Sequence, residues 1–265
     1  MMALENQIAV VTGASSGMGR EFARQICLHD CSLDEIWLIG RSEKKLKQIK
    51  IALEEAVISA DTRVRIFPTD LTDKEDQNAF FHHLNEEKPR IRMLVCAAGM
   101  GVIGNAERLP MKPQLETVEL NCEALTAVTF GCLPCCRQGS RILLLSSASA
   151  FLPQPGFAVY AASKSYVLSL ARALGRELRN RGISVTAVCP GPVDTPFFKR
   201  AEEYQKRRPG KDAFLADPKK VVKKALRDAM HRRPVSIYGF SMKGACLAGK
   251  ILPADLLMWA FEKLF

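Results

Sequence analysis

Short apolar runs alternate with longer amphipathic segments along most of the chain. The apolar runs predict strands at residues 8–12, 36–39, 64–68, 93–96, 142–146, 184–189 and 235–238. The amphipathic segments between them predict helices at residues 17–28, 43–56, 73–87, 114–133, 158–181 and 218–231. Several strands are almost continuously apolar, which is typical of strands covered by helices on both faces. The alternation therefore predicts an α/β fold with a doubly wound, parallel sheet of about seven strands.

Two segments depart from this alternation. Residues 190–216 are rich in charge and proline and show no period, so we expect a loop there that contacts a substrate. Residues 253–265 are strongly apolar but too short and too charged to span a bilayer. We expect this segment to form a C-terminal helix that covers a pocket, packs at a subunit interface or rests on a membrane surface, in that order of preference. A length of 265 residues and a hydrophobic content of 48% suit one domain, residues 1–265.

The cysteines bear on the compartment and on metal binding. There are nine, an odd number, and no secretory signal precedes them, so we expect reduced thiols in a cytoplasmic protein. Cys132, Cys135 and Cys136 resemble half of a zinc site. No second pair of cysteines or histidines stands at zinc spacing, so we expect no metal.

The net charge of +10 is concentrated in residues 199–250, which contain fifteen basic and five acidic residues. Such a stretch usually forms a solvated basic surface. Aromatic residues do not interleave with the basic ones as they do where bases stack on a protein, so we expect no nucleic-acid partner. Contact with an anionic membrane surface is an alternative that we do not favour from the sequence.

A glycine-rich turn, Thr-Gly-Ala-Ser-Ser-Gly-Met-Gly at residues 12–19, joins the first predicted strand to the first helix. Gly13, Gly17 and Gly19 would let the backbone turn sharply and approach a pyrophosphate, which the N-terminus of the helix attracts. The turn lacks the Gly-Lys-Ser/Thr ending of a phosphate-binding loop, which argues against hydrolysis of a nucleoside triphosphate. We therefore predict a dinucleotide site.

The end of the second predicted strand bears on the form of the dinucleotide. A carboxylate there would bind a ribose diol and repel a 2′-phosphate, whereas this chain has Gly40 and Arg41, which favours NADP(H). Arg41 could instead be a surface charge beside a helix, and Ser42 could bind the same phosphate or cap that helix. Asp70, with Leu71, follows the third strand, where its carboxylate could face an adenine amino group or cap the next helix.

Tyr160 and Lys164 stand four residues apart on a predicted helix, so their side chains share one face. We expect the lysine ammonium to lower the pKa of the tyrosine, which is about 10 in water. Ser147, at the end of an apolar strand, could hold a substrate oxygen beside the phenol. A tyrosine and a lysine at this spacing also occur by chance in many helices, so the pair needs the support of the other motifs.

Together, these motifs resemble those of the classical short-chain dehydrogenases/reductases, from residue 7 to about residue 238. The resemblance implies a Rossmann-type fold, transfer of a hydride and a proton, and a homodimer or homotetramer built on the helices at 114–133 and 158–181. It adds Asn121 to Ser147, Tyr160 and Lys164 as a catalytic residue, one that orders a water reaching the lysine. The implied cofactor contacts are Tyr160 and Lys164 together with Gly13, Ser15, Ser16, Gly17, Met18, Gly19, Arg41, Ser42, Asp70, Leu71, Ala98, Gly99, Pro190, Gly191, Val193 and Thr195.

The chain departs from the family after the fourth predicted strand. The family often has Asn-Asn-Ala-Gly there, whereas this chain has Cys96, Ala97, Ala98 and Gly99. The amide side chains that tie this turn to the neighbouring backbone are absent, so the sequence leaves the rigidity of the turn and the affinity for the cofactor open.

The resemblance predicts an NADP(H)-dependent oxidoreductase that interconverts a ketone or aldehyde and an alcohol. We expect an apolar, steroid-like or lipid-like substrate, because a group of apolar residues is expected near the site: Phe151, Leu152, Pro153, Phe157, Phe197, Phe198, Trp259, Phe261 and Phe265. One alternative is reduction of a 3-oxoacyl thioester, with residues 206–211 binding the phosphate and acidic face of a carrier. The other is a non-catalytic sensor or scaffold, which would not need the four catalytic residues together.

Overall fold

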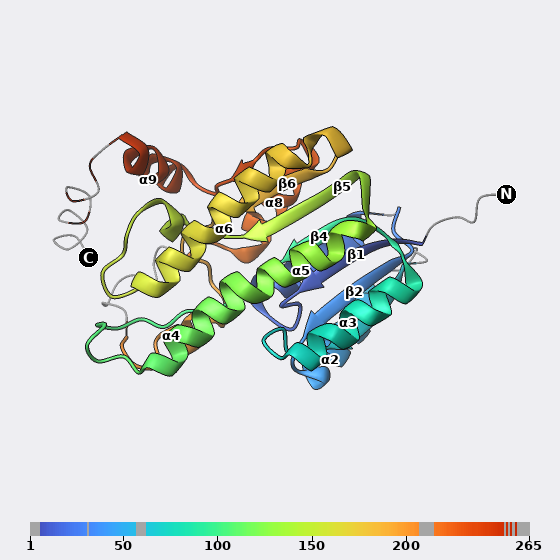
Figure 1. Ribbon diagram of the computed structural model, residues 1–265, viewed down its shortest axis with the longest axis horizontal. Coiled ribbons are helices and arrows are strands. Elements are labelled where there is room, and N and C mark those ends of the chain that lie inside the picture. Colours follow the sequence, from blue (N-terminus) through green and yellow to red (C-terminus); the bar gives the residue numbers. More distant parts are fainter. Residues whose placement is uncertain are drawn as a thin grey trace.

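The computed structural model describes residues 6–30, 32–56, 62–206 and 215–251, together with residues 253, 255 and 258. Within this part of the chain, parallel strands form one sheet in the order β3-β2-β1-β4-β5-β6-β7, with helices on both faces (Figure 1). The predicted fold class is confirmed. The strands are β1 (Gln7–Thr12), β2 (Glu35–Gly40), β3 (Arg63–Pro68), β4 (Arg90–Cys96), β5 (Cys136–Leu145), β6 (Ser184–Val188) and β7 (Val235–Ser236).

The helices form two layers around the sheet. Helices α3, α5 and α6 lie on one face, toward the viewer in Figure 1, and α1, α2 and α8 lie on the other. The described α-helices are α1 (Gly17–His29), α2 (Glu43–Ala56), α3 (Lys74–Glu87), α4 (Met111–Val118), α5 (Leu125–Cys132), α6 (Ala158–Glu177), α7 (Phe197–Ala201), α8 (Pro218–Met230) and α9 (Phe240–Ile251). None of the described helices is both long enough and apolar enough to cross a membrane.

Each face of the sheet has its own apolar core, because successive side chains of a strand point to opposite faces. On the α3, α5 and α6 side, Trp37 of β2 and Leu94 of β4 are fully buried. On the other side, Val11 of β1, Leu38 of β2 and Phe22 of α1 are fully buried. Full burial of one such side chain stabilises the fold by about 1.5–3 kcal/mol. The continuous apolar runs in the sequence thus correspond to strands buried on both faces.

The structure differs from the predicted elements in several places. The helix expected at 114–133 is α4 and α5 joined by a π-helical segment, Glu119–Ala124, and the one expected at 158–181 is α6 followed by a 3-10 turn, Arg179–Arg181. The loop expected at 190–216 contains the short helix α7, and its residues 207–214 lie outside the described residues. Helix α9 has no counterpart among the predicted elements.

The predicted C-terminal helix at 253–265 falls almost wholly outside the described residues, which include only 253, 255 and 258 of it. Trp259, Phe261 and Phe265, expected near the substrate, are among the residues that are not described.

The order of the strands determines where a ligand can bind. From β1 the chain first adds β2 and β3 on one side, and then returns to place β4 on the other side. Connections leave β1 and β4 in opposite directions, which opens a crevice at the carboxyl ends of these two strands. The glycine turn and the segment after β4 lie at this point.

Candidate active site

A cavity of about 1170 Å³ lies at the carboxyl ends of the strands. Its lining comes from the turn after β1, the ends of β2, β4, β5 and β6, and helices α6, α7 and α9. It includes most of the residues expected at the site: Gly13, Ser15, Ser16, Gly17, Met18, Gly19, Arg41, Asp70, Leu71, Ala98, Gly99, Ser147, Tyr160, Lys164, Pro190, Gly191, Val193 and Thr195. Ser42 and Asn121 are not in this lining.

The turn after β1 requires its glycines. Gly13 has φ +65°, and a Cβ there would lie 2.8 Å from Cα of Ala98. Gly17 also has a positive φ, and a Cβ on Gly19 would collide with the carbonyl oxygen of Gly13. Ser16 is the N-cap of α1, but its hydroxyl makes no capping hydrogen bond. The first amides of α1 are therefore available at a narrow cradle of bare backbone, which fits the pyrophosphate of a dinucleotide.

Arg41 and Asp70 face each other across the end of the cavity formed by β2 and β3. Their closest charged atoms are 3.9 Å apart, and the Arg41 side chain is 60% exposed. Asp70 does not cap α3, because Asp73 does so by accepting hydrogen bonds from the amides of Glu75 and Asp76. Asp70 instead accepts hydrogen bonds from Thr72 and stays in the cavity wall. A guanidinium that is exposed and only loosely paired can bind a phosphate group.

Ser42 contacts the helix rather than the cavity. Its hydroxyl accepts a long hydrogen bond of 3.4 Å from the amide of Lys45, near the start of α2. Of its two predicted roles, the structure shows the cap.

The turn after β4 is held by other groups than the missing asparagines. The hydroxyl of Thr12 accepts hydrogen bonds from the amides of Ala97 and Ala98, at 3.0 and 3.1 Å. Asn121 binds both backbone groups of Met100, accepting from its amide at 2.9 Å and donating to its carbonyl at 2.8 Å. Thr12 and Asn121 therefore supply, from other elements, the ties that the sequence leaves open.

Asn121 reaches this turn because it lies in the π-helical segment between α4 and α5. A π-helical segment has one more residue per turn than an α-helix, and such segments are frequent at functional sites. The Asn121 side chain is fully buried and also donates a hydrogen bond to the Ser163 hydroxyl of α6. Asn121 and Lys164 lie against the same glycine, Gly99, on which a Cβ would be 3.1 Å from both side chains. Asn121 thus supports the site from behind its wall.

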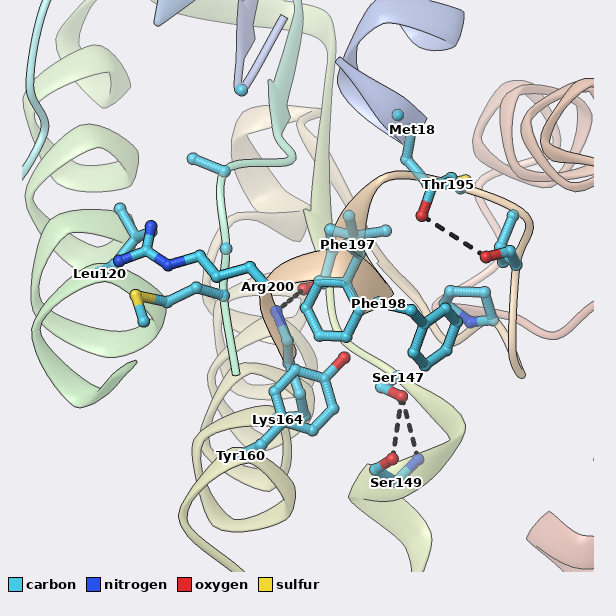
Figure 2. A pocket seen from close by; sticks show the side chains of 18 of the residues that line it. Met18, Leu120, Ser147, Ser149, Tyr160, Lys164, Thr195, Phe197, Phe198 and Arg200 are labelled. Atoms are coloured by element: carbon cyan, nitrogen blue, oxygen red, sulfur yellow. Dashed lines mark hydrogen bonds between the residues drawn. The ribbon is translucent and has the colours of Figure 1, made fainter. Parts of the chain in front are cut away.

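Tyr160, Lys164 and Ser147 come together in the cavity, as the sequence predicts (Figure 2). Tyr160 and Lys164 project from one face of α6. The Lys164 amino group lies 5.6 Å from the centre of the Tyr160 ring and donates a hydrogen bond of 2.9 Å to the carbonyl oxygen of Leu145, at the end of β5. The Ser147 hydroxyl is fixed by Ser149, accepting from its amide at 3.1 Å and donating to its hydroxyl at 3.2 Å.

The pKa values at this site are set mainly by burial. Burial raises the pKa of Tyr160 to about 12, and the Ser147 hydroxyl offsets this only in part. Burial also lowers the pKa of Lys164 to about 8, because an ammonium is costly away from water. The net shift of the Tyr160 pKa in this structure is therefore upward, opposite to the expected lowering, and it is set by burial, Ser147 and Cys189 rather than by Lys164. At neutral pH the tyrosine holds its proton and the lysine is charged.

Aromatic side chains enclose the catalytic group. The Tyr160 ring stacks on Phe157, with ring centres 4.2 Å apart, and contacts Phe197 of α7 at 5.4 Å. Of the apolar residues expected near the substrate, Leu152, Phe157, Phe197 and Phe198 line the cavity. Phe151 and Pro153 are not in its lining.

Some residues that line the cavity belong to no local sequence motif. Met242 and Ala248 come from α9, almost a hundred residues after Tyr160 in the chain, and complete the wall beside Gly191. Arg200 of α7 spans the mouth to Glu116 of α4, with charged atoms 3.3 Å apart. These contacts depend on how distant segments fold together.

Comparison with known proteins decides the family. A family model described as short chain dehydrogenase matches residues 7–206, which is most of the chain. The chain belongs to the short-chain dehydrogenase family. It is 31% identical over 196 residues to sulfoacetaldehyde reductase 2 of Chromohalobacter salexigens, which covers 72% of this chain and 75% of that protein. It is 27% identical over 213 residues to a 3beta-hydroxysteroid dehydrogenase of Mediterraneibacter gnavus, covering 77% and 72% of the two chains.

A solved structure resembles this short-chain dehydrogenase over almost its full length. A short-chain dehydrogenase from Sphingobium yanoikuyae in complex with NADPH has a TM-score of 0.76 and 25% sequence identity, covering 92% of each chain. The resemblance seen in the sequence motifs is therefore confirmed, and with it the Rossmann-type fold and the oxidoreductase class.

The thiols of this short-chain dehydrogenase do not assemble a metal site in the part that the structure describes. No group of three or more metal-binding side chains comes together there. Cys132, Cys135 and Cys136, which resemble half of a zinc site, are free and buried in the core on the α3, α5 and α6 side of the sheet. Burial raises the pKa of Cys136 to about 12, so this thiol is protonated at neutral pH.

Proposed function

We propose that this short-chain dehydrogenase uses NADP(H) to interconvert an apolar ketone or aldehyde and the corresponding alcohol. The observation that carries the proposal is the meeting of Ser147, Tyr160 and Lys164 in one cavity that also contains the glycine cradle. A non-catalytic sensor would need the cradle but not these three groups. The cradle fits a dinucleotide by its bare backbone and by the free amides at the start of α1.

The chain's own residues supply the proton and the orientation. When bound, the reduced nicotinamide supplies the hydride. Tyr160, which is protonated at neutral pH because its pKa is about 12, donates its proton to the carbonyl oxygen as that oxygen gains negative charge. In this step the single hydroxyl hydrogen of Ser147 turns from Ser149 to the same oxygen and holds it beside the phenol. Lys164 provides a positive charge near the phenolate that remains, and Asn121 fixes the backbone around the lysine.

The preference for NADP(H) rests on Arg41. Its guanidinium lines the cavity at the end of β2, where no carboxylate of that strand stands. In this proposal, Arg41 binds the 2′-phosphate and Asp70, next to it, faces the adenine. Among the similar structures, the one from Sphingobium yanoikuyae contains NADPH and one from Burkholderia phymatum contains NAD, so the proposal rests on Arg41 itself.

The apolar substrate rests on the cavity wall. Phe157 and Phe197 contact the Tyr160 ring, and Leu152 and Phe198 line the same cavity, so an apolar group beside the reacting carbonyl would meet apolar side chains. The 3beta-hydroxysteroid dehydrogenase among the relatives supports a steroid-like or lipid-like compound, whereas the similar sulfoacetaldehyde reductase is named for a small, charged aldehyde. Because the relatives differ in this way, the proposal of an apolar substrate rests on the side chains that line the cavity of this chain.

A 3-oxoacyl thioester is the second candidate substrate. Lys206 lies in the cavity lining and begins the basic stretch 206–211 that we expect to contact a carrier's phosphate. The thioester would enter past Lys206 and present its 3-oxo group to Tyr160 and Ser147.

We also propose a homodimer or homotetramer in the cytoplasm. Met111, Leu115 and Val118 form an exposed apolar row along α4, and Phe130 of α5 and Tyr166 of α6 are exposed as well. All of these residues except Met111 belong to the two helical segments expected at a subunit interface, and Met111 lies just before the first of them. Burial of such a row between two copies would remove apolar surface from water.

One assay tests the proposed substrate and cofactor together. The purified protein is given bulky apolar ketones, small polar aldehydes and 3-oxoacyl thioesters, each with NADPH and with NADH. We expect the highest kcat/KM for a bulky ketone with NADPH. A higher kcat/KM for the thioesters would favour the second candidate, and a strong preference for NADH would refute the role of Arg41.

A further inference from the structure

Helix α9 has two faces with different surroundings. One face packs against the rest of the domain: Met242 and Ala248 line the cavity, and Cys246 is buried. The contact is close, because a Cβ added to Gly249 would lie 2.7 Å from the carbonyl oxygen of Phe151. This face belongs to the site already described.

The opposite face of α9 is apolar and exposed. Phe240, Leu247 and Ile251 are 91%, 59% and 69% exposed. Their spacing of seven and four residues places them in one row along the helix, on the side away from Met242 and Cys246. A row of large apolar side chains in water is unusual for a surface helix and indicates an interaction site. In Figure 1, α9 lies at the outer end of the molecule, where nothing drawn as a described element covers it.

Basic side chains flank this row. Residues 215–251 contain nine basic and two acidic residues. Lys224 of α8 and Lys243 of α9 lie around Phe240, and the Lys243 amino group is 5.3 Å from the centre of the Phe240 ring. Lys220 and Arg227, about one turn before and after Lys224, are exposed on the same side of α8.

The two acidic residues do not neutralise this surface. Asp228 is buried and already paired with Lys224 and Arg233. Asp217 caps the start of α8 by accepting a hydrogen bond from the amide of Lys219. The positive charge of Lys220, Arg227 and Lys243 therefore remains available to an anionic partner.

We propose that the exposed row of α9 and the basic side of α8 together dock on an anionic lipid bilayer. An apolar ridge with lysines and arginines at its sides is the arrangement by which a helix lies in the lipid interface. The apolar side chains enter the headgroup region while the lysines and arginines meet lipid phosphates. The proposed surface lies on α8 and α9 and is separate from residues 253–265, for which the sequence ranks a membrane surface last.

Docking would also place the cavity next to the bilayer, because the other face of α9 is its wall. A compound that partitions into lipid could then pass from the bilayer to Tyr160 along α9. This step rests on the proposed function, namely reduction of an apolar carbonyl compound.

Vesicle sedimentation tests the docking. The full chain is mixed with vesicles of phosphatidylcholine alone and of phosphatidylcholine with phosphatidylglycerol. We expect binding to the anionic vesicles that weakens as salt increases. The double variant Phe240→Ser, Leu247→Ser should bind at least about tenfold more weakly, because two large side chains no longer enter the lipid. Lys220→Gln with Arg227→Gln should weaken binding to anionic vesicles roughly tenfold.

Matched controls come from α2, which packs beside β2 and β3, at the other edge of the sheet from β7. Ile51 is 54% exposed, and Lys44 and Lys45 are exposed. Ile51→Ser, and Lys44→Gln with Lys45→Gln, should leave vesicle binding unchanged. Equal losses in the α2 and α9 variants would refute the assigned surface, and so would a wild-type chain that binds neither kind of vesicle.

Two further measurements distinguish docking on a bilayer from misfolding and from self-association. The α9 variants should reduce a water-soluble ketone, without vesicles, at the wild-type rate, which shows that they fold. Vesicle binding needs no substrate, so its result stands whether or not the proposed reaction is correct. In analytical ultracentrifugation the variants should have the wild-type mass. A change from oligomer to monomer in Phe240→Ser, Leu247→Ser would overturn the proposal, because the row would then be a subunit interface.

Discussion

Lys164→Met should have a larger free energy of unfolding, relative to the wild type at the same pH, at pH 7 than at pH 10. Lys164 is buried, and burial lowers its pKa from 10.5 to about 8. One pKa unit corresponds to about 1.4 kcal/mol, so keeping the charged lysine in the folded state costs about 3 kcal/mol at pH 7. Methionine has a similar length and carries no charge, so it avoids this cost.

The dependence on pH follows from where the proton resides. Between about pH 8 and pH 10.5, the unfolded chain binds the lysine proton and the folded chain does not. The free energy of unfolding of the wild type therefore rises with pH through this window. The increase, which comes from the neutral Lys164 of the folded state, is lost as the pH falls toward 8. The methionine variant has no such contribution. The advantage of the variant at pH 7 should thus exceed its advantage at pH 10 by about 2–3 kcal/mol.

Urea denaturation of both proteins at the two pH values measures this difference. Loss of the hydrogen bond from Lys164 to Leu145 costs the variant about 1–3 kcal/mol, but this cost is nearly the same at both pH values and cancels in the comparison. Reductase activity should be lost in the variant. A difference between variant and wild type that does not change with pH would refute the reasoning, since it would show that the lysine is not desolvated.

Other variants test the cofactor site, the support of the turn and the wall of the cavity. Arg41→Ala should raise the KM for NADPH by roughly 10- to 100-fold in steady-state assays, because a charge-assisted hydrogen bond to a phosphate contributes about 1.5–3 kcal/mol, and should leave the KM for NADH unchanged. Asn121→Ala should lower the free energy of unfolding by about 1–3 kcal/mol in urea titrations, because it leaves buried backbone groups of the turn after β4 without partners. Gly249→Val should raise the KM for bulky ketones, since its side chain would push α9 away from the carbonyl of Phe151, whereas Gly244→Ala, which meets nothing within 4 Å, should not.

Much of the sheet was predictable because its strands are buried on both faces and read as unbroken apolar runs. The central strands β1, β2 and β4 are of this kind. Helix α9 was not predictable, because the stretch Phe240–Ile251 has apolar residues on two opposite faces and four small residues, and so lacks a single amphipathic stripe. The π-helical segment at Asn121 was also missed, since its six residues are too few to change the apolar periodicity of the helices around it.

The site was predictable where chemistry is carried by short motifs and not where it depends on packing. The glycine turn, Ser147, Tyr160 and Lys164 could be found from their motifs taken together. The support of the turn by Thr12 could not, because it crosses from β1 to the segment after β4. The shift of the Tyr160 pKa is upward rather than downward for a related reason: it is governed by burial, which the sequence does not show, and not by the charge of Lys164.

The most direct test of the central claim compares Tyr160→Phe with Tyr166→Phe. Both tyrosines lie on α6, but the Tyr166 hydroxyl points away from the cavity and contacts Thr126 at 2.8 Å. Turnover of the best ketone is measured with NADPH, and binding of NADPH is measured separately by fluorescence. We predict that Tyr160→Phe binds NADPH but loses at least about a hundredfold in kcat, as expected when a general acid is removed, while Tyr166→Phe retains wild-type turnover. Normal turnover in Tyr160→Phe would contradict the account.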